Sequence, residues 1–175
     1  EAKHIWFEGV DQIDRKGMVI PFGASIPIAK AMADTESMPG ALACYEMNGE
    51  PLSPDHGFPV GTVVPGFVGA RSVKWLGKII VSDRPSVNHY VATAYKLVTE
   101  GTPAEWQASD PINNFVINSV TCIPSAGAVV SSGKLRVSGY ALPPGMPGRT
   151  VGKLELSTNG GKSWTAARFT SKAKP

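Results

Sequence analysis

Apolar residues come in short runs through the first part of the chain, and glycine, proline or a polar residue ends each of them. Short runs of this kind, rich in β-branched and aromatic residues, are typical of strands. We expect strands at 5–7, 41–47, 61–64, 72–76 and 78–81. Residues 25–34 have a helical pattern, with Ser25 as N-cap and Pro27 in the first turn. The pattern predicts an irregular, loop-rich α+β domain.

A different pattern begins after residues 99–113, where polar residues and prolines increase and a linker is expected. Beyond this stretch, apolar and polar residues alternate in short segments, which predicts strands at 116–122, 134–141, 152–157 and 163–169. A complete immunoglobulin-like sandwich needs about seven strands. We therefore expect a truncated immunoglobulin-like β-sandwich in the second part of the chain.

The sharpest turn of this second part is expected at 158–162, because Asn159 and the glycines after it accept the positive φ of a tight hairpin. Leu154 and Leu156 then share one face of the hairpin, since side chains alternate along a strand. Trp164 is expected to be a core aromatic residue across this hairpin.

Composition and charge exclude several classes of protein for this chain. At 42% hydrophobic and 18% charged, the 175 residues are typical of a globular protein and exclude a mainly disordered chain. No apolar stretch reaches the ~18 residues of a membrane helix, and the first residues contain no apolar leader. The net charge of +3 comes from scattered bases, which disfavours nucleic acid and suits a smaller anion.

The two cysteines, Cys44 and Cys122, exclude a disulfide scaffold and a metal site built from cysteines, because they lie far apart and form no CxxC pair. We expect both to be small buried apolar residues. The histidines have no metal-ligand spacing, and the signatures of zinc proteases, serine hydrolases and Walker loops are absent from the sequence.

Candidate chemistry begins in residues 46–60, where proline and glycine favour a loop of fixed path. Asp55 and His56 are adjacent in this loop, and adjacency by itself does not make a catalytic dyad. His56 is either a donor to a ligand or a loop histidine bonded to the backbone.

The second candidate segment, 66–76, combines a glycine that permits close backbone approach with two cations and a hydroxyl. On a strand, Ser72 and Lys74 would point to one face and Arg71 and Val73 to the other, so only one pair could address a given ligand. The alternative is two solvated bases at a strand edge. These patterns alone predict an anion-binding loop beside a partial sandwich.

The same segments carry a resemblance to a known family. Residues 45–60 (YEMNGEPLSPDHGFPV), 64–66 (VPG) and 69–76 (GARSVKWL) closely resemble the molybdenum-cofactor domain of the sulfite oxidase family. The resemblance extends to 7–11, 22–27, 88–90, 94–96 and 117–120, where that family's immunoglobulin-like dimerisation domain begins. It implies the C-terminal part of the cofactor domain at 1–110 and the N-terminal part of the dimerisation domain at 111–175.

The resemblance also implies a bound molybdopterin that carries molybdenum. The positions expected to bind this cofactor are Asp11, His56, Arg71, Ser72, Val73 and Lys74. Lysine and histidine suit a phosphate, and aspartate suits the polar pterin edges. Tyr95 matches a tyrosine beside the metal's oxo group and the substrate, where a phenol donates to an oxyanion or relays a proton. Otherwise Tyr95 is a partly buried core tyrosine. We expect the Asp-His-Gly-Phe-Pro turn and the Arg-Ser-Val-Lys-Trp segment to converge on the cofactor.

Two departures from the family pattern matter. Gly61 stands where the family usually has an arginine that helps to hold the cofactor. The family's molybdenum-ligating cysteine lies upstream of the matched residues, and neither Cys44 nor Cys122 has a matching context, so no metal ligand is assigned. A substrate-binding arginine of the dimerisation domain also has no counterpart. We expect a fragment of an enzyme, without turnover of its own.

The intact protein implied by the resemblance oxidises sulfite to sulfate by oxygen-atom transfer and passes electrons to cytochrome c or a haem domain. It is a homodimer, periplasmic if bacterial and mitochondrial or peroxisomal if eukaryotic. Nitrate reductases and sulfane dehydrogenases share much of the motif, whereas 88–90 (NHY) and 94–96 (AYK) favour bacterial sulfite dehydrogenases. The remaining alternative, suggested by Gly61, is a non-catalytic binding or assembly module of the same fold.

Overall fold

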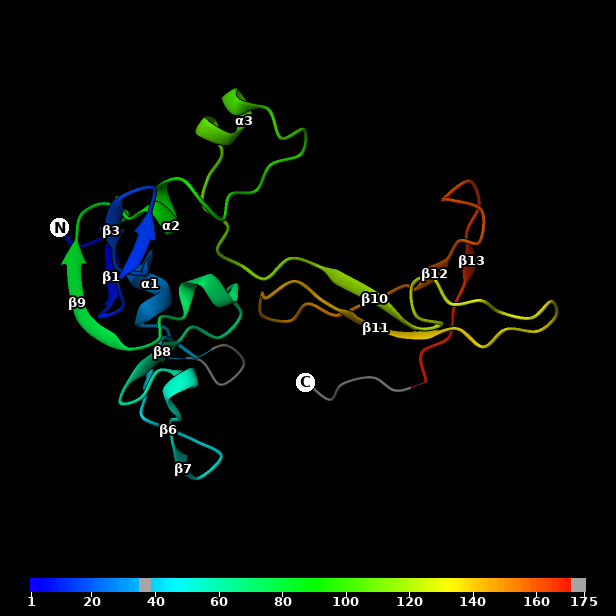
Figure 1. Cartoon of the computed structure of the whole chain (residues 1–175), viewed down its shortest axis with the longest axis horizontal. Helices are drawn as coiled ribbons and strands as arrows, with labels where there is room; N and C mark the ends of the chain where they lie inside the picture. The colour runs from blue at the N-terminus through cyan, green and yellow to red at the C-terminus, as the bar shows by residue number, and fades with distance from the viewer. Residues whose placement is uncertain (35–38, 171–175) are drawn as a thin grey trace. The chain divides into compact units, whose positions relative to one another are not determined.

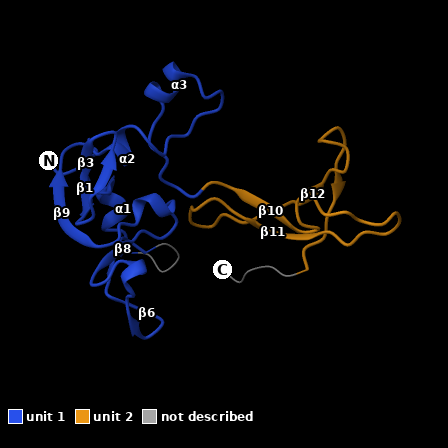
Figure 2. Ribbon diagram, viewed as in Figure 1, with its two compact units in different colours: residues 1–115 blue, residues 116–175 orange. Residues whose placement is uncertain are grey.

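Residues 1–34 and 39–170 are described by the structure, which is a computed structural model. The chain divides into two compact units, Glu1–Phe115 and Val116–Pro175 (Figure 2). The domain boundary expected between residues 110 and 111 stays a prediction.

A three-stranded antiparallel sheet organises the first unit. Its strand order is β4 (Gly23–Pro27), β1 (His4–Gly9) and β9 (Leu76–Ser82), with β1 in the centre. Figure 1 shows β1 beside β9, although the two strands lie far apart in the sequence. The strands expected at 5–7 and 78–81 are therefore confirmed.

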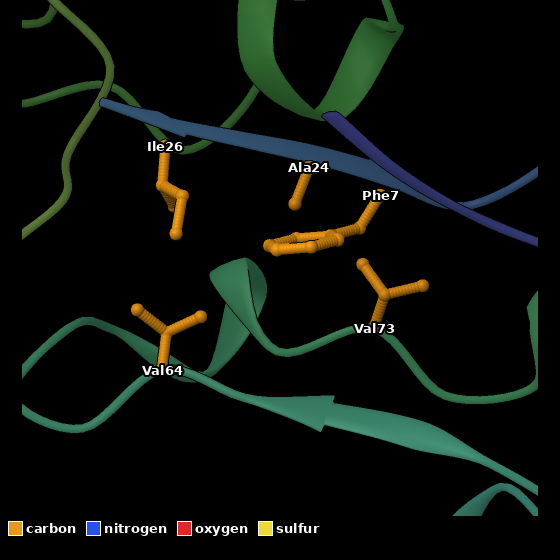
Figure 3. Packing of buried hydrophobic residues seen from close by; sticks show 5 residues of the cluster. All are labelled: Phe7, Ala24, Ile26, Val64 and Val73. Atoms are coloured by element: carbon orange, nitrogen blue, oxygen red, sulfur yellow. The ribbon is translucent and has the colours of Figure 1, made fainter. Parts of the chain in front are cut away.

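The core of the first unit lies between this sheet and the segments that follow β8 (Gly61–Val63). Figure 3 shows Phe7, Ala24 and Ile26 pointing from β1 and β4 toward Val64 and Val73. All five are at most 4% exposed. Burial of such apolar side chains contributes roughly 1.5–3 kcal/mol each for the larger ones. Through Val73, the core thus holds the second candidate segment against the sheet.

The expected helix at 25–34 is largely wrong. Ser25 lies in β4, where it is 4% exposed and its Oγ accepts a hydrogen bond from Ser86 N at 3.0 Å. The helix α1 (Ile28–Ala31) begins only after Pro27. Pairing of Ile26 with Ile5 on β1 adds ladder bonds and core burial, which outweigh the local helical pattern.

The expected strand at 72–76 is also wrong in its first part. Gly69–Arg71 forms the short 3-10 turn η2, an irregular stretch follows, and β9 begins at Leu76. Trp75 has φ +50°, a left-handed conformation that no regular strand contains. The alternation of side chains assumed for a strand therefore does not apply to residues 71–75.

Small two-stranded sheets and short helices complete the first unit. The strand pairs are β2 (Ile13–Arg15) with β3 (Met18–Ile20), β5 (Leu42–Cys44) with β8, and β6 (Glu46–Met47) with β7 (Glu50–Pro51). The remaining elements are the turn η1 (Pro54–His56) and the helices α2 (His89–Ala92) and α3 (Pro103–Ala108). This mixture of many strands and few helices confirms the α+β expectation.

Helix α3 corrects the expected linker at 99–113, because a capped helix stands in the middle of it. The Thr102 side chain accepts from Glu105 N, and Pro103 occupies the first turn. None of the described helices is long and apolar enough to cross a membrane.

The second unit contains two separate two-stranded sheets in its described part. One pairs β10 (Asn118–Ile123) with β11 (Ser138–Leu142), and the other pairs β12 (Glu155–Leu156) with β13 (Thr165–Ala166). The turn expected at 158–162 is confirmed, with positive φ at Gly160 and Gly161. The immunoglobulin-like sandwich stays a prediction.

Two burial expectations for the second half of the chain are wrong. Trp164 is 59% exposed, and its Nε1 donates to Gly161 O at 3.1 Å instead of packing in a core. Cys122 is exposed, while Cys44 in the first unit is half-buried. The reason is shared by the whole second unit: none of its residues within 116–170 is buried, so no core exists there to receive them.

Candidate functional site

The Asp-His-Gly-Phe-Pro turn and the Arg-Ser-Val-Lys-Trp segment lie side by side. Trp75 N donates to Gly57 O at 3.3 Å, and Leu76 N donates to Val60 O at 2.7 Å. Side chains add two further bonds to the turn, from Lys74 Nζ to Asp55 O and from Trp75 Nε1 to Pro54 O at 3.0 Å. Four hydrogen bonds thus hold the two expected segments together.

Thr62 joins the start of the second segment to β8. Its backbone N donates to Val73 O at 2.8 Å, and its Oγ1 accepts from Val73 N at 2.7 Å. Both backbone groups of Val73 are therefore satisfied within the protein, while its side chain is 0% exposed in the core. Val73 thus anchors the segment within the protein.

Close backbone approach explains one glycine of the turn. Gly57 has φ +93°, and a Cβ placed there would lie 2.7 Å from Lys74 Cβ and 2.8 Å from Trp75 N. A side chain at this position would push the two segments apart, because real Cβ atoms essentially never come this close to other heavy atoms.

A pocket of about 310 Å³ opens beside the joined segments. Its polar lining consists of Asp11, Ser72, Lys74 and Tyr95, all of them expected site residues. The remaining lining residues are Phe22, Gly69, Ala70 and Trp75. The structure therefore brings four of the expected residues, distant in sequence, into one concave site. Such pockets, mostly apolar with a few convergent polar groups, are typical of ligand sites.

The charged groups of this pocket remain available to a ligand. Asp11 Oδ1 accepts from Phe22 N at 3.1 Å, and Lys74 Nζ lies 5.7 Å from the Trp75 ring centroid. Among the residues that the structure describes, neither Asp11 nor Lys74 forms an ion pair. Ser72 Oγ accepts from Val64 N at 3.1 Å, which still leaves its hydroxyl proton to donate.

Tyr95 enters the pocket from a separate part of the chain. It is 45% exposed and has φ +53°, which is unusual for a tyrosine. Its ring lies 6.3 Å from that of Tyr90, which stacks on the pocket residue Phe22 at 4.5 Å. The reading of Tyr95 as a core tyrosine is wrong, because nearly half of its surface is open.

Three expected residues do not line the pocket: His56, Arg71 and Val73. His56 is exposed, and its Nδ1 lies 2.7 Å from Ser53 Oγ, a side-chain partner instead of the backbone one expected for a loop histidine. It is the last residue of η1.

Arg71 differs most from its expectation. It is 0% exposed, so the reading of two solvated bases at a strand edge is wrong for it. Burial lowers the pKa of its guanidinium, and an electrostatic interaction with Tyr95 acts in the opposite direction. Its side chain donates hydrogen bonds to Ile112 O, Asn113 Oδ1 and Tyr90 O.

Sequence reasoning missed the aromatic walls of the pocket, Phe22 and Trp75. Both stand in segments that carry the family resemblance, but only as part of the motif. No cluster of three or more histidine, cysteine or acidic residues able to hold a metal occurs within 1–34 and 39–170.

Comparison with known proteins gives two family matches. The family described as "Oxidoreductase molybdopterin binding domain" matches residues 1–90. The family described as "Mo-co oxidoreductase dimerisation domain" matches residues 109–175.

The chain is similar to several curated proteins. It is 40% identical over 182 residues to "Sulfite oxidase, mitochondrial" of Drosophila melanogaster, covering 100% of this chain and 30% of the relative. It is 42% identical over 169 residues to the Mus musculus protein of the same name, covering 95% and 30%. A "Nitrate reductase [NADPH]" of Neurospora crassa is 37% identical over 185 residues, covering 95% and 18%. The chain thus spans about 30% of the length of the mitochondrial sulfite oxidases it matches.

A solved structure shares the fold. The sulfane dehydrogenase SoxCD from Paracoccus pantotrophus superposes with a TM-score of 0.71 at 28% sequence identity, covering 98% of this chain and 40% of that one. Together with the family matches, these similarities show that the chain belongs to the sulfite oxidase family of molybdopterin-binding oxidoreductases.

Proposed function

We propose that the complete polypeptide carrying this sequence oxidises sulfite to sulfate by oxygen-atom transfer, with molybdopterin as cofactor. The observation that carries the proposal is that relatives named sulfite oxidases match the whole chain at 40% identity. The pocket lined by Asp11, Ser72, Lys74 and Tyr95, built from the segments of the family motif, supports it. The overall reaction consumes sulfite and water and yields sulfate, two protons and two electrons.

The residues of the pocket fit a molybdopterin cofactor. Lys74 offers a cation for a phosphate, Asp11 offers an acceptor for ring N–H groups, and Ser72 offers a hydroxyl. Phe22 and Trp75 supply flat apolar walls for a heterocycle. When bound, the cofactor supplies the two-electron oxygen-atom-transfer chemistry. The protein's share is to position it and to gather positive charge around an anionic substrate.

A hydrogen bond to the turn holds the Lys74 side chain in place for binding an anion. One of its three N–H groups donates to Asp55 O, which leaves the others for an anion. We propose that His56, Arg71 and Val73 act from outside the pocket: His56 by stabilising the turn with Ser53, and Val73 by anchoring the segment through Thr62.

Tyr95 is the proposed catalytic residue. Its half-exposed phenol lines the pocket and can donate a hydrogen bond to an oxyanion or relay one of the two protons released.

Gly61 limits cofactor affinity in this proposal. It is buried at the start of β8, and a Cβ there would lie 3.2 Å from Val73 O. The position therefore supplies no cationic donor, and Lys74 is the cation among the residues lining the pocket. Loss of one charge-assisted hydrogen bond lowers binding by roughly 1.5–3 kcal/mol.

The partners follow from the relatives and remain part of the proposal. We propose a homodimer, because residues 109–175 match a dimerisation domain. Electrons would leave to a cytochrome c or a haem domain. The names of the matched relatives favour mitochondria for a eukaryotic source, while a bacterial protein would be periplasmic.

Two other substrates are favoured by specific observations. The Neurospora crassa relative is named a nitrate reductase, and the matched solved structure is a sulfane dehydrogenase. Lys74 and the hydroxyls of Ser72 and Tyr95 suit nitrate as well as sulfite, because both are oxyanions. A non-catalytic module remains the alternative that Gly61 supports.

The test uses the complete polypeptide, produced together with molybdopterin biosynthesis. We expect about one molybdenum per chain and sulfite-dependent reduction of cytochrome c. Tyr95→Phe should lower kcat/KM about 100-fold or more, as loss of a proton-transfer group does. Tyr45→Phe is the matched control, since Tyr45 is 65% exposed and outside the pocket, and it should leave kcat/KM unchanged.

Each contrary outcome points to one alternative. If the molybdenum-loaded protein reduces nitrate or oxidises sulfane sulfur and does not oxidise sulfite, the proposed substrate is wrong and the other compound takes its place. A folded protein without molybdenum or pterin supports the non-catalytic module. For residues 1–175 alone we expect no turnover, because neither Cys44 nor Cys122 is matched to the metal-ligating position.

A further inference from the structure

Arg71 is the largest side chain in the first unit to be fully buried. A buried guanidinium is unfavourable unless its N–H groups are bonded and its charge is compensated. Within the described residues, Arg71 forms no ion pair with any carboxylate. Its Nη2 has no hydrogen-bond partner there at all. A cation retained at such cost in a small core calls for a specific role.

The bonds that Arg71 does form lead to two stretches of backbone. Its Nε donates to Ile112 O and to Asn113 Oδ1, both at 3.1 Å, and its Nη1 donates to Tyr90 O at 2.9 Å. These acceptors lie 19, 41 and 42 residues away in sequence. One planar side chain therefore fixes the chain on both sides of the segment that contains Tyr95.

A single hydrogen bond connects Ile112, a partner of Arg71, to Tyr95. Ile112 N donates to Tyr95 O at 2.7 Å, while Ile112 O accepts from Arg71. On the other side, the ring of Tyr90 lies 6.3 Å from that of Tyr95. Tyr95 is half-exposed and has a left-handed backbone conformation, so local preference and burial alone hold it poorly.

We infer that Arg71 is a positioning residue: its buried guanidinium fixes Tyr90 and Ile112 and thereby holds the Tyr95 phenol in the pocket. Arg71 lies between Ala70 and Ser72, which line the pocket, so the same side chain ties the pocket wall to its phenol. Tyr95 also lies close enough to act electrostatically on Arg71: burial lowers the pKa of the guanidinium, and the interaction with Tyr95 raises it. The inference rests on the proposed role of Tyr95.

The first test observes Tyr95 without turnover. The complete polypeptide is labelled with 3-fluorotyrosine, and the ¹⁹F resonance of Tyr95 is assigned from its loss in Tyr95→Phe. We expect one sharp resonance in the wild type. Arg71→Lys keeps the charge but lacks the planar fork, so the resonance should shift and broaden. Arg84→Lys, a change of an exposed arginine, is the matched control and should leave it unmoved.

The second test is a double-mutant cycle on sulfite oxidation. Arg71→Lys should lower kcat/KM about 10- to 100-fold, as a small misplacement of a reacting group does. In the Tyr95→Phe background the same change should lower it less than about threefold, because the group being positioned is gone. An equal loss in both backgrounds, or an unmoved ¹⁹F resonance in Arg71→Lys, overturns the inference.

A milder variant covers the case in which Arg71→Lys does not fold. Asn113→Ala removes one acceptor of Arg71 and leaves the guanidinium in place. It should move the Tyr95 resonance in the same direction by a smaller amount, and an unmoved resonance counts against the inference. If the wild-type protein oxidises no sulfite, the proposed function fails, while the ¹⁹F comparison still decides the role of Arg71.

Discussion

Single polar side chains hold the loops of the first unit. Ser25 Oγ accepts from Ser86 N, Thr62 Oγ1 from Val73 N, and Asp11 Oδ1 from Phe22 N. Each bond joins a strand or turn to a backbone group that lies outside any ladder. Because the strands of this unit are short, many backbone N–H groups have no partner in a sheet. Side-chain oxygens accept hydrogen bonds from some of them instead.

Glu105 gives a pH-dependent prediction at this scale. Its carboxylate accepts from Thr99 N and Thr99 Oγ1, and from the N–H groups of Glu100 and Gly101 at 2.8 and 2.9 Å. These bonds, those from Thr99 foremost, lower its pKa from 4.5 to about 2. Because the pKa is lowered by folding, the stabilisation is complete above the unfolded value of 4.5 and is lost as the pH falls to about 2.

The measurement compares thermal unfolding of the wild type and Glu105→Gln from pH 7 to pH 2. The wild type should have the higher Tm at pH 7, and the difference should disappear near pH 2. Glu100→Gln, a change of an exposed neighbour, should show little difference at any pH. A Tm difference for Glu105→Gln that persists unchanged at pH 2 would contradict the assignment.

Among the elements, η1 and the irregular stretch before β9 form the junction beside the candidate pocket. They carry no regular pairing, and their contact depends on bonds from Lys74 and Trp75 and on the missing side chain of Gly57. Of these two elements, the stretch before β9 supplies lining residues to the candidate pocket, and η1 supports that stretch through the bonds of Lys74 and Trp75.

Two glycines of the first unit allow the cost of a left-handed backbone to be measured apart from the cost of a close contact. Gly57 and Gly49 have φ +93° and +82°, but a Cβ at Gly49 would meet nothing within 4 Å. Gly49→Ala should lower the free energy of unfolding by about 1–2 kcal/mol, the cost of the left-handed conformation. Gly57→Ala should lower it by a further ~1–3 kcal/mol through overpacking against Lys74. Urea unfolding measures both, and equal losses would show that the turn does not contact Lys74 closely.

On the scale of the whole molecule, the two units differ in kind. The first has a core of buried residues around Phe7 and Ile26. The second has no buried residue among 116–170, and its β10 strand is exposed along its full length. A unit without buried residues is not expected to be stable by itself in water.

Two lysines allow a matched test of this difference by limited trypsin digestion. Lys78 on β9 and Lys153 before β12 have side chains that are 72% and 73% exposed. In residues 1–175 alone, trypsin should cleave at Lys153 well before Lys78, because cleavage requires local opening. In the complete polypeptide, Lys153 should become protected. Cleavage at both sites at equal rates in 1–175 would mean that the second unit is as stable as the first.

Several elements could be predicted from the sequence because neighbouring residues alone determine them. The strands at 5–7 and 78–81, and the turn at 158–162, follow from apolar runs and from residues that accept positive φ. The helix at 25–34 and the strand at 72–76 failed for one reason: pairing of β4 with β1, and bonds from Thr62 and Gly57, decided their conformation from a distance.

The sequence by itself determined the family and the segments that meet at the candidate site, because the motif spells out residue types and their order. It also determined most of the turns, since glycine and proline act on their own backbone. Only the tertiary structure decided that Asp11, Ser72, Lys74 and Tyr95 share a pocket, that His56 lies outside it, and that Arg71 is buried. Burial and hydrogen bonding between distant segments are properties of the packed chain, and no local pattern contains them.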